Sequence, residues 1–132
     1  MKVADRLSHI SKSLLQAFPI CQAVIRDYRV QPGDPTTGWF KLVLKNDITV
    51  HVFEFLARGI IRKYAYTLLI DHEVVLRYDN APHHRAISTF PHHKHVHGEV
   101  KPLENPSIGE FIREATELIK ALKARCKEGV GT

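Results

Sequence analysis

The sequence predicts an α+β protein: an antiparallel meander sheet of about five strands, with an N-terminal and a C-terminal helix packed on it. Three observations predict this class. Apolar residues recur at helical spacing near both ends of the chain, short turn signals separate β-rich runs in the middle, and a length of 132 residues is typical of one domain. We therefore expect residues 1–132 to form a single α+β domain.

The two ends of the chain carry the helix signals. At the N-terminal end, apolar residues at steps of three and four residues predict a helix that Pro19 ends. These residues are Val3, Leu7, Ile10, Leu14 and Phe18. The second helix is expected to begin after Ser107, an N-cap residue followed three positions later by Glu110 in the capping-box pattern. Its apolar stripe consists of Ile108, Phe111, Ile112, Ala115, Ile119 and Leu122.

The middle of the chain predicts a meander of short strands. A β-rich run over residues 20–30 is followed by a loop at 31–38, which contains two prolines and two glycines. Further strands are expected at 39–45, 48–56, 60–70 and 74–78. Turn signals of two or three residues separate these strands, so neighbouring strands should pair as antiparallel hairpins.

The expected strand register gathers polar side chains on one face of the sheet. If the turn at Arg58–Gly59 pairs Leu56 with Ile60, Glu54 lies opposite Arg62. If the next hairpin pairs Ile70 with Val74, Tyr66 lies opposite Tyr78. The set that shares this face is Glu54, Arg62, Tyr64, Tyr66 and Tyr78. It predicts either a half-buried face with one cross-strand ion pair or the polar floor of a functional site, and a shift of one residue would separate it.

Composition restricts the class of protein. Lysine plus arginine number 19 against 14 aspartates plus glutamates, a net charge of +5 that favours RNA or an acidic protein as partner. Cys21 and Cys126 lie far apart outside any CxxC pair, which argues against a zinc ribbon or a disulfide scaffold. No apolar segment approaches the roughly 20 residues that span a bilayer, and the first residues do not resemble a signal peptide. We expect a soluble, cytoplasmic protein with no membrane partner.

Histidines are concentrated in one stretch of the chain. Six of the nine fall in the 15 residues from His83 to His97, where an even spread would place one. Imidazoles titrate at about pH 6.5, so paired histidines could act as acid and base in metal-free RNA cleavage. Arg77 and Lys94 could then bind phosphate. The candidate catalytic residues are His83, His84, His92, His93 and Asp79, with Asp79 orienting an imidazole.

Two alternatives for the histidines remain open. His93, His95 and His97 alternate, so an extended chain would put them on one face, and His83 or His84 could add a ligand for zinc. Adjacent histidines are not a zinc-finger spacing and no cysteine lies nearby, so we predict no metal and no cofactor and keep a histidine-rich metal-binding protein as the alternative. The other alternative is that the histidines belong to a loop without a specific role.

Two sequence blocks resemble a known family. Arg77–His84 (RYDNAPHH) and Thr89–His95 (TFPHHKH) resemble the TumE-like family, whose members are toxin components of type II toxin–antitoxin pairs. Arg62–Tyr66 and the strand that carries Glu54 are similar to the core of that family, and the resemblance covers residues 39–101. The two blocks together are more specific than either alone.

The resemblance implies a cognate antitoxin, either acidic or of the helix-turn-helix class, and growth inhibition through RNA or translation. The site positions that it implies are Tyr64, Tyr66, Arg77, Asp79, His83, His84, His92, His93, Lys94 and His95. We therefore predict a toxin that acts on RNA, most simply a metal-independent ribonuclease. The expected substrate-binding residues are Arg77, Lys94, His95, Tyr64, Tyr66, Arg62 and Glu54. A non-catalytic module that binds nucleic acid or antitoxin stays open as an alternative, as does a homodimer.

Overall fold

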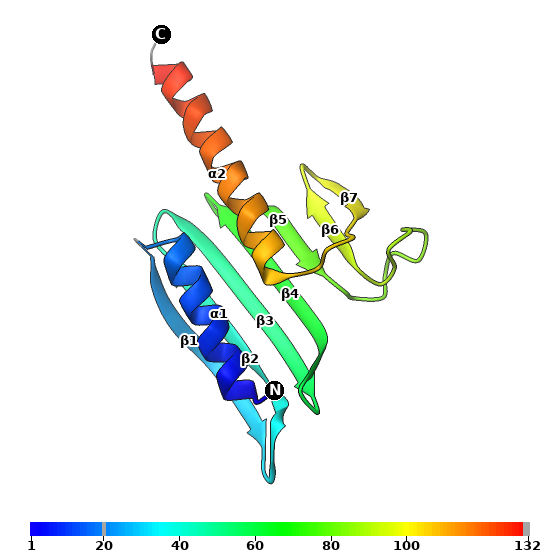
Figure 1. Cartoon of the computed structure of the whole chain (residues 1–132). Helices are drawn as coiled ribbons and strands as arrows, with labels where there is room; N and C mark the ends of the chain where they lie inside the picture. Colours follow the sequence, from blue (N-terminus) through cyan, green and yellow to red (C-terminus); the bar gives the residue numbers. More distant parts are fainter. Residues whose placement is uncertain (20, 131–132) are drawn as a thin grey trace.

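The protein is a single curved sheet with two helices on one of its faces (Figure 1). The computed structural model describes residues 1–19 and 21–130, of which residues 22–26 and 124–130 are described by their backbone alone. The elements are α1 (Val3–Ala17), β1 (Gln22–Gln31), β2 (Asp34–Lys45), β3 (Ile48–Ala57), β4 (Ile60–Ile70), β5 (Glu73–Asp79), β6 (His93–Val96), β7 (Glu99–Pro102) and α2 (Ile108–Val130). All strands pair antiparallel in chain order, so the α+β class and the meander are confirmed, with seven strands rather than five.

Both predicted helices are confirmed. Helix α1 ends at Ala17, two residues before Pro19, and α2 begins directly after Ser107. The Ser107 Oγ accepts the backbone N–H of Glu110 at 3.1 Å, which is the predicted cap. The apolar stripes of both helices pack on the sheet. Their buried residues are Val3, Ile10, Leu14, Phe18, Ile108, Phe111 and Ala115.

The predicted loop at 31–38 is wrong, because β1 and β2 form a long hairpin whose turn is only Pro32–Gly33. The Asp34 carboxylate accepts the backbone N–H of Thr36 at 2.9 Å. It also accepts the hydroxyls of Thr36 and Thr37. These local bonds hold the start of β2, although its Pro and Gly content is typical of a loop. Ile20, the first residue of the predicted strand at 20–30, lies outside the described residues.

Strands β6 and β7 were not predicted. They form a hairpin that turns at His97–Gly98, where the backbone φ angles are 52° and 75°, and they extend the sheet beyond β5. Each strand has only four residues and neither has an apolar alternation. Instead, β6 pairs with the edge of β5, where Asp79 lies opposite His93, and β7 pairs with β6.

The predicted register is right at one strand pair and wrong at the other. Tyr66 lies opposite Tyr78, as expected. The pairing of Glu54 with Arg62 is wrong for two reasons, each of which shifts the register by one residue. The turn pairs Leu56 with Ile61, and a β-bulge follows between Leu56 and Phe55, so Glu54 lies opposite Tyr64. Arg62 is exposed, so the expected cross-strand ion pair does not form.

The two faces of the sheet differ in their side chains. The face under the helices is the core, with buried Phe40, Leu42, Leu44, Val50, Val52, Leu56, Tyr64, Tyr66, Leu68, Leu76 and Tyr78. We call the opposite face, which neither helix covers, the open face. Cys21 is buried and free, whereas the side chain of Cys126 lies outside those described. In the described part of the chain, neither helix has the length and apolar composition needed to cross a membrane.

Candidate functional site

Two rows of side chains cross the open face of the sheet. The register pairs Lys41 with Phe53, Phe53 with Ala65, Ala65 with Asp79, and Asp79 with His93. Directly paired residues point to the same face, so these five side chains form one row from β2 to β6. The second row, from the same pairings, is Val43, His51, Thr67, Arg77 and His95. Neighbouring strands lie about 4.8 Å apart, so each row extends over about 19 Å.

The middle of the open face is a shallow depression of about 530 Å³. Its lining includes Lys41, Phe53, Thr67 and Arg77. Beside it, the Lys41 ammonium lies 5.7 Å from the ring centroid of Trp39, within the range of a cation–π contact. The open face therefore presents aromatic rings and fixed cations together.

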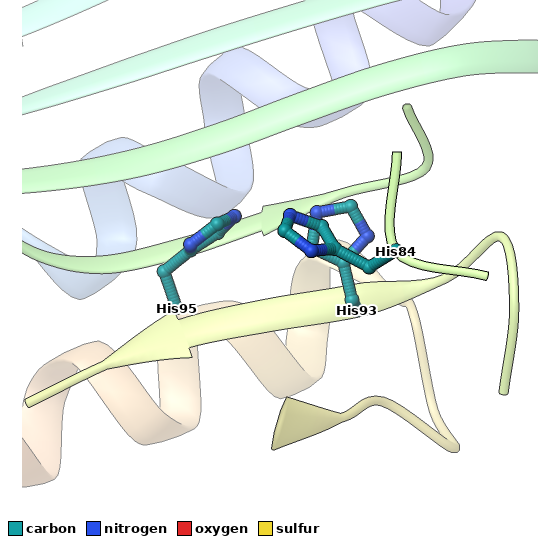
Figure 2. Close-up of side chains that lie close together, drawn as sticks. All are labelled: His84, His93 and His95. Carbon is teal, nitrogen blue, oxygen red and sulfur yellow. The ribbon is translucent and has the colours of Figure 1, made fainter. Parts of the chain in front are cut away.

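Three imidazoles meet at the β6 end of the two rows (Figure 2). His93 and His95 project from β6, and His84 comes from the loop of residues 80–92 that joins β5 to β6. The ring centroids are 4.7 Å apart for His84 and His93, 5.0 Å for His93 and His95, and 5.6 Å for His84 and His95. One ring nitrogen from each lies within 4.8 Å of the others, so the three could hold a metal ion. We call these three residues the imidazole cluster.

The Asp79 carboxylate lies against the imidazole cluster. Its Oδ1 accepts the Ala81 backbone N–H at 2.9 Å and lies 3.0 Å from His93 Nε2. Its Oδ2 accepts Arg77 Nε–H at 2.9 Å and lies 3.6 Å from His95 Nε2. Burial alone would raise the pKa of Asp79, but the Ala81 N–H and the Arg77 guanidinium hold that pKa below its ordinary value. The carboxylate is therefore a fixed negative charge beside the imidazoles.

The members of the imidazole cluster differ in access. The His93 residue is 2% exposed, and its Nδ1–H donates to the Pro91 carbonyl oxygen at 3.0 Å. The His95 side chain is 34% exposed, and His84 is partly exposed. Burial lowers the pKa of His95, Asp79 opposes this effect, and the other two imidazoles add to it. His84 and His95 can therefore reach a ligand on the open face, whereas His93 positions its neighbours.

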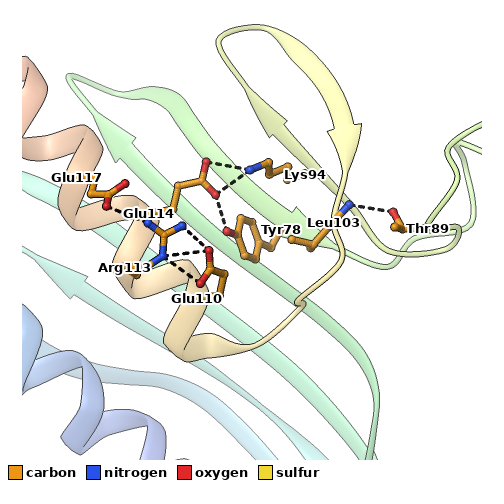
Figure 3. Close-up of polar contacts among 8 residues, drawn as sticks. All are labelled: Tyr78, Thr89, Lys94, Leu103, Glu110, Arg113, Glu114 and Glu117. Carbon is orange, nitrogen blue, oxygen red and sulfur yellow. Dashed lines mark hydrogen bonds and ion pairs between the residues drawn. The ribbon is translucent and has the colours of Figure 1, made fainter.

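Lys94 points away from the imidazole cluster, because it alternates with His93 and His95 along β6. Its Nζ lies 3.1 Å from both carboxylate oxygens of Glu114 on α2, and the Tyr78 hydroxyl donates to the same carboxylate at 2.5 Å (Figure 3). Lys94 thus attaches the β6 strand to helix α2 and does not face the ligands of the open face.

The predicted polar floor also lies on the face under the helices. Glu54 is 0% exposed and accepts two hydrogen bonds from the Arg6 guanidinium, at 2.8 and 2.9 Å, and one from the Tyr66 hydroxyl at 2.5 Å. The Tyr64 hydroxyl lies 2.8 Å from His92 Nδ1, with the two rings stacked. Burial raises the pKa of Tyr64 and of Tyr66 well above the ordinary value. The expected polar floor therefore contacts His92 but does not underlie the imidazole cluster, which lies on the opposite face of the sheet.

The structure thus divides the predicted site residues into three groups. Five lie together on the open face: Arg77, Asp79, His84, His93 and His95. Five lie on the helix side or its edge: Glu54, Tyr64, Tyr66, His92 and Lys94. Two, His83 and Arg62, are exposed and outside both groups.

Sequence reasoning missed the residues that extend the site across the sheet. Lys41, Phe53 and Thr67 were not singled out. Period-two alternation along the β2 and β3 sequences would have identified them as one surface. No comparable signal exists for Arg6 or Glu114, which reach their partners through tertiary packing.

The comparison with known protein families identifies the chain. No curated protein and no solved structure matches it. Residues 12–124 match the family model described as Toxin TumE, a span that includes both rows of the open face and the imidazole cluster. A toxin of a toxin–antitoxin pair implies an antitoxin as its partner. Since the match covers most of the sequence, the chain belongs to the TumE toxin family.

Proposed function

We propose that this toxin binds single-stranded RNA across the open face and cleaves it at the imidazole cluster without a metal ion. The observation that carries the proposal is the continuity of the two rows, which lead from aromatic and cationic side chains to accessible imidazoles. A sheet with one free face that carries rings and cations suits unstacked bases and their phosphates.

The open face supplies two kinds of contact for RNA. Bases can stack on Phe53 and Trp39, since every base has a π-face and stacking tolerates any sequence. Lys41 on β2 and Arg77 on β5 both line the depression and can neutralise phosphates. An RNA strand bound along the rows would bring its backbone to His84 and His95.

The chemistry needs two proton-transfer groups and a cation. A base takes the 2′-hydroxyl proton, the freed oxygen attacks the adjacent phosphorus, and an acid protonates the departing 5′ oxygen. The products are a 2′,3′-cyclic phosphate and a 5′-hydroxyl. His84 and His95, with ring centroids 5.6 Å apart, provide the acid and base in this proposal, and Arg77 offsets the developing phosphorane charge. Asp79 and His93 are positioning residues.

Cleavage of labelled single-stranded RNA by tag-free protein in excess chelator tests the proposal. We expect His84→Ala and His95→Ala each to reduce cleavage by about 10²–10⁴-fold while RNA binding persists. The control is His9→Ala, because His9 is exposed on α1 and lies away from the open face. RNA that stays intact with wild-type protein that still arrests growth would reject the ribonuclease. Binding without cleavage in wild-type protein would favour the non-catalytic module.

The partner is the other part of the proposal. The resemblance of the blocks Arg77–His84 and Thr89–His95 to the TumE-like family supports a helix-turn-helix antitoxin that neutralises this toxin in the cytoplasm. Coexpression with the product of the adjacent reading frame tests it. Copurification and restored growth are expected, and an adjacent product of another class that does both would overturn the helix-turn-helix assignment.

A further inference from the structure

We propose that the imidazole cluster also binds one divalent transition-metal ion, such as zinc, through His84, His93 and His95. One ring nitrogen from each lies within 4.8 Å of the others. Nitrogens that share a tetrahedral zinc ion lie about 3.4 Å apart, given zinc–nitrogen bonds of about 2.1 Å. Small shifts of the side chains, about 1 Å, would bring the three to one ion, and His84 comes from a loop that can supply such a shift.

His93 is oriented as a metal ligand. A carbonyl oxygen can only accept, so the contact with Pro91 places the ring proton on Nδ1. That contact leaves Nε2, which faces the Asp79 carboxylate, as the ring nitrogen that can coordinate a metal ion. A hydrogen bond from the other ring nitrogen is the usual support of a metal-bound histidine. His95, two residues on, projects from the same face of β6 with its Nε2 toward the same carboxylate.

The charges around Asp79 also favour a bound cation. The Nε2 atoms of His93 and His95 lie 3.0 and 3.6 Å from one carboxylate, so a negative charge lies directly beside the proposed ligands. One divalent ion offsets the carboxylate and satisfies all three imidazoles. Imidazole ligands select zinc, nickel, copper or iron over magnesium and calcium, which prefer oxygen.

Metal binding would regulate the proposed cleavage. This consequence rests on the proposed function, because His84 and His95 are also its acid and base. A ring nitrogen bound to zinc has no lone pair to accept a proton. Zinc should therefore inhibit the toxin, and a chelator should restore it.

Calorimetric titration of zinc chloride into chelator-treated, tag-free protein tests the site without RNA. We expect about one equivalent to bind, with the melting temperature raised by about 5–10 °C at a 100-fold excess over the dissociation constant. His84→Ala and His95→Ala should each abolish stoichiometric binding. His97→Asn is the matched control, because His97 is exposed in the neighbouring turn and asparagine tolerates its positive φ. Less than about a tenth of an equivalent, or binding that survives in His84→Ala, overturns the proposal.

A second arm separates this site from the proposed function. RNA cleavage by the same protein is measured in chelator and after one equivalent of zinc is added. If the protein cleaves RNA in chelator and zinc lowers that cleavage at least tenfold, both the metal site and the ribonuclease are supported. Zinc binding with no cleavage in either condition keeps the metal site and rejects the ribonuclease. Cleavage that requires zinc keeps the site but overturns both the inhibition and the metal-independent reaction.

Discussion

The substitution Arg6→Ala tests how much the buried carboxylate under α1 depends on its partner. Glu54 is fully buried and accepts two hydrogen bonds from Arg6, leaving only the Tyr66 hydroxyl if Arg6 is removed. Removing one partner of a buried ion pair costs about 3–5 kcal/mol, because the other charge stays uncompensated. The Arg6 side chain is 14% exposed, so water can partly replace it, and we expect about 3 kcal/mol.

Urea unfolding followed by the fluorescence of Trp39 measures this loss, and the melting temperature should fall by about 10 °C. Arg113→Ala is the matched control, since Arg113 makes comparable ion pairs with Glu110 and Glu117 on the exposed surface of α2 and should change stability little. Adding Glu54→Leu to Arg6→Ala removes the isolated charge and should recover stability. The reasoning is refuted if Arg6→Ala and Arg113→Ala have the same free energy of unfolding, or if the double variant is no more stable than Arg6→Ala.

Three further predictions concern the open face and the scaffold. Lys41→Ala should weaken RNA binding for all sequences and reduce the steepness of log affinity against log salt concentration by about 1, measured by fluorescence anisotropy. An unchanged slope would exclude a contact between Lys41 and phosphate. Ser107→Ala should lower the free energy of unfolding by about 1 kcal/mol, because the Glu110 N–H loses its acceptor; no change in urea midpoint would contradict this. Gly38→Ala should destabilise, since its Cβ would lie 2.2 Å from a β1 carbonyl oxygen, whereas the Cβ of Gly109→Ala would meet the Ser107 Oγ at 4.0 Å, an ordinary van der Waals contact, and should not destabilise. Equal urea midpoints for the two variants would contradict this.

The helices and the long hairpins could be predicted because their signals are local. The apolar stripe of α1, the cap at Ser107 and the turns after Lys45, Ala57 and Ile70 all act within a few residues. The Tyr66–Tyr78 pair was also correct, although a bulge lies between it and the turn. The Glu54–Arg62 pair was wrong because the turn pairs Leu56 with Ile61 rather than Ile60 and a bulge then adds one more residue. Neither feature leaves a mark in the hydrophobic pattern.

The β6–β7 hairpin could not be predicted from its own residues. Its strands are short and polar, and it forms because the edge of β5 offers unpaired backbone groups. The same limit applies to the site. The sequence located the histidine-rich stretch, but adjacent histidines diverge: His92 contacts Tyr64 on the helix side, whereas His93 faces Asp79 on the open face. The start of β6 at His93 determines that His93 and His95 share the open face.

Strand β7 also has a consequence for how the protein behaves at high concentration. It is the last strand of the sheet, and an unprotected edge strand is a template for aggregation by strand addition. Here the edge exposes the charged side chains of Glu99 and Lys101, and Pro102 contributes no N–H. A second sheet therefore finds an interrupted hydrogen-bond ladder at the histidine-bearing end. The edge strand next to the imidazole cluster is therefore protected against fibre-like self-association, even though the open face beside it is left uncovered.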